Sequence, residues 1–113
     1  MRRVVVTGLG LLTPLGCGVE YVWDRLLKGD SSATKITRFD TSEYSTGYAC
    51  EIPFCDVSPG KFNPDEWMSP KDRRKVDDFI LYGICAADQA VRDAGWVPDK
   101  EEDVLKPGVM IGS

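Results

Sequence analysis

The segment from Ser69 to Trp96 constrains the fold more than any other part of the sequence, because it predicts one long helix. It reads SPKDRRKVDDFILYGICAADQAVRDAGW. Ser69 is a good N-cap, Pro70 fits the first helical position and Gly95 fits the C-terminal end. We therefore expect a single helix over residues 70–94. Its apolar positions follow the helical period and predict one packed face, formed by Val76, Phe79, Ile80, Gly83, Ala87, Ala90, Val91 and Ala94.

The N-terminal segment predicts a buried strand followed by a glycine-rich loop. Residues 3–7 are mostly β-branched, and Gly8 and Gly10 follow directly. A dinucleotide-binding loop needs Gly-x-Gly-x-x-Gly opening straight onto a helix, but Thr13 occupies the third glycine position and Pro14 delays the helix. A nucleotide-binding α/β domain is therefore the weakest functional alternative. We expect instead a tight turn in which glycine supplies the φ values that the turn needs.

Shorter signals complete the predicted order of elements. Apolar residues at helical spacing predict a helix over residues 19–28, with Gly29 at its C-terminal end. Residues 30–69 are rich in turn-forming residues and contain one short candidate strand at 48–52. A second apolar strand is expected at 108–112. The order strand, helix, long helix, strand indicates the α/β class.

Charge and hydropathy narrow the functional classes. The 113 residues carry a formal net charge of −4, with an isoelectric point near 4.8. Nucleic-acid binders are usually basic, so this balance argues against such a partner. No apolar run approaches the roughly 20 residues that span a bilayer, and glycine and proline interrupt the N-terminal apolar stretch. We expect no nucleic-acid or membrane partner and a cytoplasmic location, with the mitochondrial matrix as the alternative.

Four cysteines and the absence of histidine limit the chemistry. Cys17, Cys50, Cys55 and Cys85 form no Cys-x-x-Cys pair, and the chain contains no histidine. We therefore expect no metal site and no cofactor. Because histidine is the commonest general base, this chain alone cannot build a Ser-His or Cys-His catalytic pair. The thiols are expected to be reduced and mostly buried as small apolar groups.

A cluster of cations lies at the start of the expected long helix. Lys71, Arg74 and Lys75 fall on the side opposite the apolar face, whereas Arg73 points toward that face. The helix dipole disfavours positive charge near a helix N-terminus, so a purely structural surface would not favour this placement. Two interpretations follow from the residues alone. Either an acidic partner docks here, or the cluster is a solvated face that neighbouring aspartates partly neutralise.

These motifs, in their order and spacing, resemble the β-ketoacyl-[acyl-carrier-protein] synthases of the thiolase-like condensing-enzyme family, and within it the elongating synthase II. The opening VVVTGLGLLTPLG resembles the start of these enzymes. The other matching segments are Val22-Trp23 with Leu26-Leu27, residues 36–40, residues 69–82, residues 93–95 and residues 108–113. The resemblance implies that residues 1–113 are the N-terminal segment of a synthase domain, holding an incomplete part of a layered α/β/α/β/α fold.

The resemblance further implies an acyltransferase of fatty acid biosynthesis that works as a homodimer. Such enzymes perform a decarboxylative Claisen condensation between a malonyl group on acyl carrier protein and an acyl chain on an enzyme cysteine. That cysteine is followed by Thr-Ser, and two histidines complete the site. No cysteine here has that context, so no catalytic residue is assigned.

The same resemblance bears on the cations of the chain. Family residues matching Lys71, Arg74 and Lys75 contact the acidic carrier protein, which favours docking for this cluster. The alternative is a non-catalytic module that docks the carrier without performing chemistry.

Overall fold

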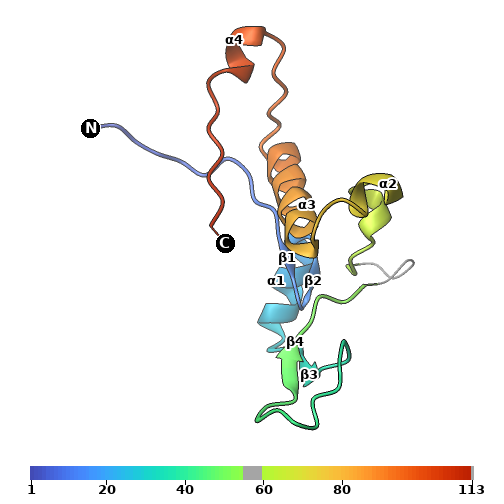
Figure 1. Cartoon of the computed structure of the whole chain (residues 1–113). Coiled ribbons are helices and arrows are strands. Elements are labelled where there is room, and N and C mark those ends of the chain that lie inside the picture. Colours follow the sequence, from blue (N-terminus) through green and yellow to red (C-terminus); the bar gives the residue numbers. More distant parts are fainter. Residues whose placement is uncertain (55–59, 113) are drawn as a thin grey trace.

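The computed structural model describes residues 1–54 and 60–112. The elements are β1 (Leu12–Thr13), β2 (Gly16–Cys17), α1 (Val19–Leu27), β3 (Ala33–Lys35), β4 (Tyr48–Cys50), the 3₁₀ helix η1 (Pro64–Glu66), α2 (Pro70–Arg73), α3 (Asp78–Asp93) and α4 (Glu101–Val104). Strand β1 pairs antiparallel with β2, and β3 pairs antiparallel with β4. Helix α3 is the central element, and α2 stands to one side of it (Figure 1).

Helix α1 confirms the helix predicted over residues 19–28. Its first turn follows Gly18, and Val22 is buried on its inner side. The chain leaves the helix through Gly29, whose φ of 73° lies in the left-handed region. The Gly29 N–H bonds to the carbonyl of Leu26, and the Asp30 N–H bonds to the carbonyl of Arg25. This is the glycine-terminated helix end that the sequence predicts.

The irregular segment of residues 30–69 holds one predicted strand and one that was not predicted. Strand β4 lies within the expected 48–52 strand, and its partner β3 aligns Ala33 with Cys50. A side-chain contact closes the end of this hairpin, because the Thr37 hydroxyl donates to the Glu51 carboxylate at 2.7 Å.

The prediction of a single helix over residues 70–94 is wrong, because the chain forms two helices there. Helix α2 ends at Arg73, and Asp77 is extended, with φ −78° and ψ 158°, before α3 begins. The Lys75 N–H bonds to the Asp72 carbonyl, three residues back, which tightens the end of α2. Asp77 is the N-cap of α3 without a capping hydrogen bond from its side chain, and Asp78 places a negative charge at the positive end of the helix dipole, which favours a second helix start here.

The core lies on a different side of α3 from the predicted face. Leu81 and Cys85 are buried against Phe62, and the hairpin β1–β2, Ile52 and residues 67–68 pack on that side of the helix. Partly buried side chains complete this cluster: Leu12, Cys17, Ile52, Trp67, Met68 and Tyr82. The predicted apolar face is largely open in the described chain, because Phe79 is 60% exposed and Val91 is 42% exposed.

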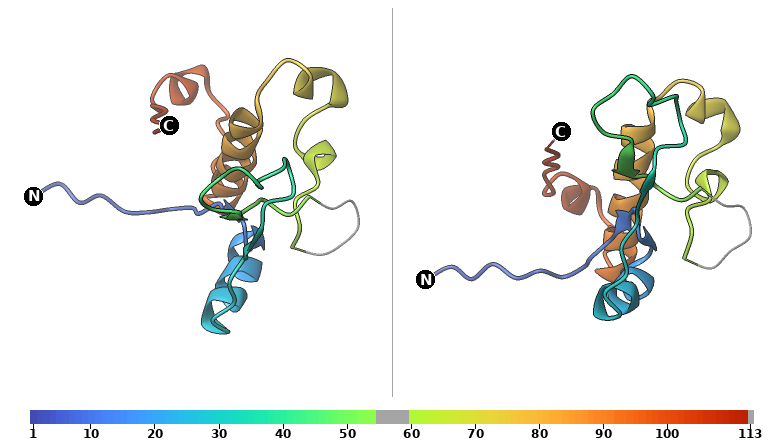
Figure 2. Two further views of the ribbon diagram at one scale, coloured as in Figure 1. Left: turned by 60° about the horizontal axis from the view of Figure 1, so that its bottom comes forward. Right: turned by 90° about the horizontal axis from the view of Figure 1, so that it is seen from below.

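The strands expected at residues 3–7 and 108–112 are also absent from the described residues. Both segments leave the body of the molecule, and the N-terminal arm extends far from it in all three views (Figures 1 and 2). Val4 is 96% exposed and Met110 is 99% exposed. A strand requires hydrogen bonds to a neighbouring strand, and within residues 1–54 and 60–112 neither segment has one.

Candidate functional site

The paired glycines at the N-terminus pack directly on the backbone of α3. A Cβ atom at Gly10 would lie 1.9 Å from the carbonyl oxygen of Ala86, and one at Gly8 would lie 2.1 Å from that of Ala90. Neither glycine has a positive φ, so the expected explanation by turn geometry is wrong. Glycine is required here for close approach of two backbones. The backbone of α3 occupies the space beside the pair, which disfavours the nucleotide-binding alternative.

Two side chains of α3, which sequence reasoning missed, hold this N-terminal segment. The Leu9 N–H donates to Asp93 Oδ2 at 2.8 Å. The Leu11 N–H donates to Gln89 Oε1, and Gln89 Nε2 donates to the Leu11 carbonyl, both at 3.2 Å. Gln89 and Asp93 thus take the place of a neighbouring strand for this stretch of chain. Gln89 and Asp93 lie one helical turn apart, but Asp88 and Arg92 are also polar, so the sequence does not single them out.

Helix α2 presents the predicted docking residues, and a local network fixes its single turn. The Ser69 hydroxyl accepts from the Asp72 N–H and donates to Asp72 Oδ2 at 2.8 Å. That hydrogen bond, and next the Lys75 ammonium, lower the pKa of the Asp72 carboxyl below its ordinary value. Arg73 forms an ion pair with Asp65 at 2.7 Å, which ties α2 to η1.

Lys71, Arg74 and Lys75, here called the basic trio, lie on α2 and the turn that follows it. All three are exposed. Their predicted position opposite the apolar face of one long helix is wrong, because the chain breaks before α3 begins. Lys75 Nζ pairs with Asp72 Oδ1 at 3.0 Å. In the described part of the chain, no ion pair involves Lys71 or Arg74, so two of the three positive charges face solvent alone.

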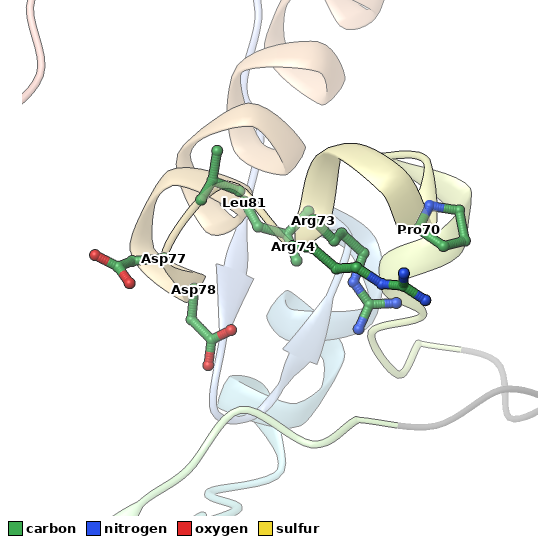
Figure 3. Close-up of a pocket in the computed structure, with 7 residues that line it drawn as sticks. Pro70, Arg73, Arg74, Asp77, Asp78 and Leu81 are labelled. Carbon is green, nitrogen blue, oxygen red and sulfur yellow. The ribbon is translucent and has the colours of Figure 1, made fainter.

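A pocket of about 300 Å³ separates α2 from the start of α3. Its apolar lining comes from Pro70, Val76 and Leu81, and the guanidinium groups of Arg73 and Arg74 lie beside it. The carboxylates of Asp77 and Asp78 also border the pocket but point away from those two arginines (Figure 3). Four of the seven lining residues are therefore charged, two of each sign.

The cysteines take no part in this site. Cys17 is half-buried, Cys50 is exposed and Cys85 is buried, so the prediction of mostly buried thiols is wrong for Cys50. Cys55 lies outside the described residues. The described residues contain no group of three or more Cys, Asp or Glu side chains that could hold a metal ion. In the same part of the chain, no helix is both long enough and apolar enough to cross a membrane.

Comparison with known proteins identifies relatives over the full sequence. The family model described as beta-ketoacyl synthase, N-terminal domain, matches residues 1–113. The 3-oxoacyl-[acyl-carrier-protein] synthase 2 of Rhizobium meliloti (strain 1021) is 55% identical over 113 residues, which are all of this chain and 27% of that protein. The mitochondrial 3-oxoacyl-[acyl-carrier-protein] synthase of Arabidopsis thaliana is 41% identical, over 98% of this chain and 26% of that protein.

Among solved structures, the ishigamide ketosynthase/chain length factor is similar, with a TM-score of 0.70 and 38% sequence identity. The match covers 85% of this chain and 22% of that one. The prediction of a partial α/β fold of the ketosynthase type is confirmed by this neighbour and by the family model. The chain spans about a quarter of the length of the curated relatives it matches.

Proposed function

Because this chain belongs to the β-ketoacyl synthase N-terminal domain family, we propose that residues 1–113 form the N-terminal segment of a β-ketoacyl-[acyl-carrier-protein] synthase. The proposed reaction is a decarboxylative condensation of a malonyl group on acyl carrier protein with an acyl group on the enzyme. The observation that carries the proposal is 55% identity over the whole chain to a 3-oxoacyl-[acyl-carrier-protein] synthase 2. We further propose a homodimeric enzyme in the cytoplasm.

The contribution of this segment is carrier docking rather than bond formation. The described cysteines lack the Thr-Ser context of the family nucleophile, and the sequence contains no histidine. The basic trio, by contrast, is exposed and only partly neutralised, because Asp72 pairs with Lys75 alone. An acidic carrier would neutralise Lys71 and Arg74 on arrival, and exposed cations of this kind mainly raise the association rate.

The neighbouring pocket gives the docking surface a shape as well as a charge. Leu81 and Val76 line it beside Arg74. An acidic helix of the carrier that set one apolar side chain into this pocket would bring its carboxylates over the trio. Charge would then steer the carrier, and the pocket would fix its register on the enzyme.

The test uses the full-length protein and charge reversal at Lys71, Arg74 and Lys75 together. Affinity for acyl carrier protein is expected to fall at least tenfold, or by about 1.4 kcal/mol. The catalytic efficiency should fall for malonyl-carrier substrate but not for a small carrier-free thioester. Charge reversal at Lys28, Lys35 and Lys106 together is the matched control outside the cluster, since all three are exposed and the change in net charge is the same. Rising salt should weaken wild-type binding and leave the residual binding of the trio variant almost unchanged.

The outcomes separate the competing interpretations. Equal loss in the trio variant and in the control at Lys28, Lys35 and Lys106 would reject docking through the trio and favour a solvated charged face. Carrier binding without condensation by the wild-type protein would favour the non-catalytic docking module. Loss of activity toward the small thioester as well would mean that the trio acts on folding rather than on the carrier.

A further inference from the structure

We propose that Cys17 and Cys85 form a reversible redox pair, in which a hydroperoxide oxidises Cys17 and Cys85 then closes a disulfide between β2 and α3. The inference is independent of carrier docking and of condensation. It rests on the geometry of the two thiols, on their unequal access to solvent and on the amide that lies between them.

The two sulfur atoms are already neighbours across the fold. Cys17 Sγ and Cys85 Sγ lie 3.7 Å apart, although 68 residues separate them in the sequence. The hairpin β1–β2 holds Cys17 against α3, and the bonds between Gln89 and Leu11 anchor that hairpin. A disulfide needs a sulfur separation of about 2 Å, so closure requires a shift of less than about 2 Å in a two-residue strand.

Access to the two thiols is unequal. Cys17 is half-buried and lines a cavity of about 760 Å³ together with Trp67, Gln89 and Arg92. Cys85 is completely buried behind it. A small oxidant in the cavity therefore meets Cys17 first, and Cys85 is placed to resolve the oxidised product. This is the arrangement of an attacked and a resolving thiol.

The side-chain amide of Gln89 contacts both thiols. Its Nε2 lies 3.2 Å from Cys85 Sγ and 3.5 Å from Cys17 Sγ. An N–H donor directed at sulfur favours the thiolate, which is the reactive form. Burial acts in the opposite direction, raising the pKa of Cys17 and raising that of Cys85 to about 12. The pair is therefore expected to react slowly, under sustained oxidant rather than as a rapid sensor.

The two steps balance without any further reactant. Cys17 sulfur attacks one peroxide oxygen, the O–O bond breaks, and the products are a sulfenic acid on Cys17 and one water. Cys85 sulfur then attacks Cys17 sulfur, the S–O bond breaks, and the hydroxyl leaves as water with the proton of the Cys85 thiol. Two thiols are oxidised to one disulfide while one hydrogen peroxide is reduced to two waters. A thiol reductant reverses the product by exchange.

The test is peptide mapping of the reduced full-length protein after treatment with hydrogen peroxide. Trypsin releases Cys17 in residues 4–25 and Cys85 in residues 76–92, and Cys50 and Cys55 both fall in residues 39–61, where fragment ions tell them apart. The expected result is a cross-linked pair of 4–25 with 76–92, lighter by two hydrogens than the two peptides together. Dithiothreitol should return both peptides to their free masses.

Variants establish the order of the steps. In Cys85→Ala, a 1,3-dicarbonyl probe for sulfenic acids should label Cys17, because no resolving thiol remains. In Cys17→Ala, the buried Cys85 should stay unlabelled. Cys50→Ser is the matched control and should form the cross-link as the wild type does.

The proposal is overturned if Cys50 is oxidised while residues 4–25 and 76–92 remain reduced in the wild-type protein. It is equally overturned if Cys17 or Cys85 links to a different cysteine under native conditions. The peptide map of the wild-type protein needs no substitution, so it tests the disulfide even where a variant fails to fold.

Discussion

Substituting Gly10 by alanine tests the claim that the N-terminal segment depends on direct backbone contact with α3. The new Cβ would lie 1.9 Å from the Ala86 carbonyl oxygen and 2.8 Å from the Ala90 nitrogen. Both are backbone atoms, so no side chain can rotate away, and the segment must move outward by more than about 1 Å because packed interiors have no spare space. That shift breaks the bonds of Leu11 to Gln89 and strains the bond of Leu9 to Asp93.

The expected cost follows from those bonds. Losing two neutral hydrogen bonds costs about 1 kcal/mol each, and straining one to a carboxylate costs part of its roughly 1.5 kcal/mol, so the expected local destabilisation is about 3 kcal/mol. Amide hydrogen exchange of the full-length protein measures this directly in a peptide that contains Leu9 and Leu11. Exchange there should accelerate by roughly two orders of magnitude.

Gly83→Ala provides the control for this prediction. Within the described residues, nothing lies within 4 Å of a Cβ at Gly83, and alanine is the better helix former by about 1 kcal/mol. Exchange in the peptide that contains Leu9 and Leu11 should therefore stay unchanged. If Gly10→Ala gave the same exchange as Gly83→Ala, the close-contact argument would be refuted.

Two further predictions concern titrating groups. Ser69→Ala should raise the pKa of Asp72 toward its ordinary value, since the Ser69 hydroxyl is the first cause of its lowering, and the Asp72 carboxyl chemical shift against pH measures this change. A lowered pKa stabilises the fold above the unfolded-state pKa, and that stability is lost as pH falls through the folded-state value. The free energy of unfolding of the variant should therefore depend less on pH in the acid range. Cys85, with its pKa raised to about 12, stays protonated in the fold while the unfolded chain ionises from about pH 9, so the free energy of unfolding should fall as pH rises from about 9 to about 12. Cys85→Ala should reduce that slope in denaturation curves, and Cys17, whose pKa is also raised, should keep part of it.

The helical segment shows how far sequence patterns reach in this protein. The cap at Ser69, Pro70 in the first turn and the end of the helix near Gly95 are all present as predicted. The interruption was missed because an apolar period continues across it. Asp77 and Asp78 carried the available signal, since two consecutive acids favour a helix start more than a helix interior.

The basic trio could be found from the sequence, but its surroundings could not. Which cations are neutralised depends on where η1 lies, because Asp65 reaches Arg73 from eight residues away. The pocket beside Arg74 exists only because the chain breaks before α3. Likewise, nothing in the spacing of Cys17 and Cys85 indicates that their sulfur atoms meet, since the hairpin alone brings them together.

The accessible surface of the molecule explains why two predictions do not match the structure. These are the strands predicted at both ends and the packed apolar face predicted on α3. A compact protein of this size has a radius of gyration near 13 Å and an accessible surface of about 6,200 Å². The described chain has a radius of gyration of 17.1 Å and an accessible surface of 9259 Å². Residues 4–6, residues 109–111 and Phe79 are among the exposed large apolar side chains, although the sequence patterns assign them to buried strands and a packed helix face. The proposed synthase would supply the larger body in which such residues are buried. The local elements α1 and α3, which depend on neighbouring residues, form within the described chain. The strands, which depend on distant partners, do not.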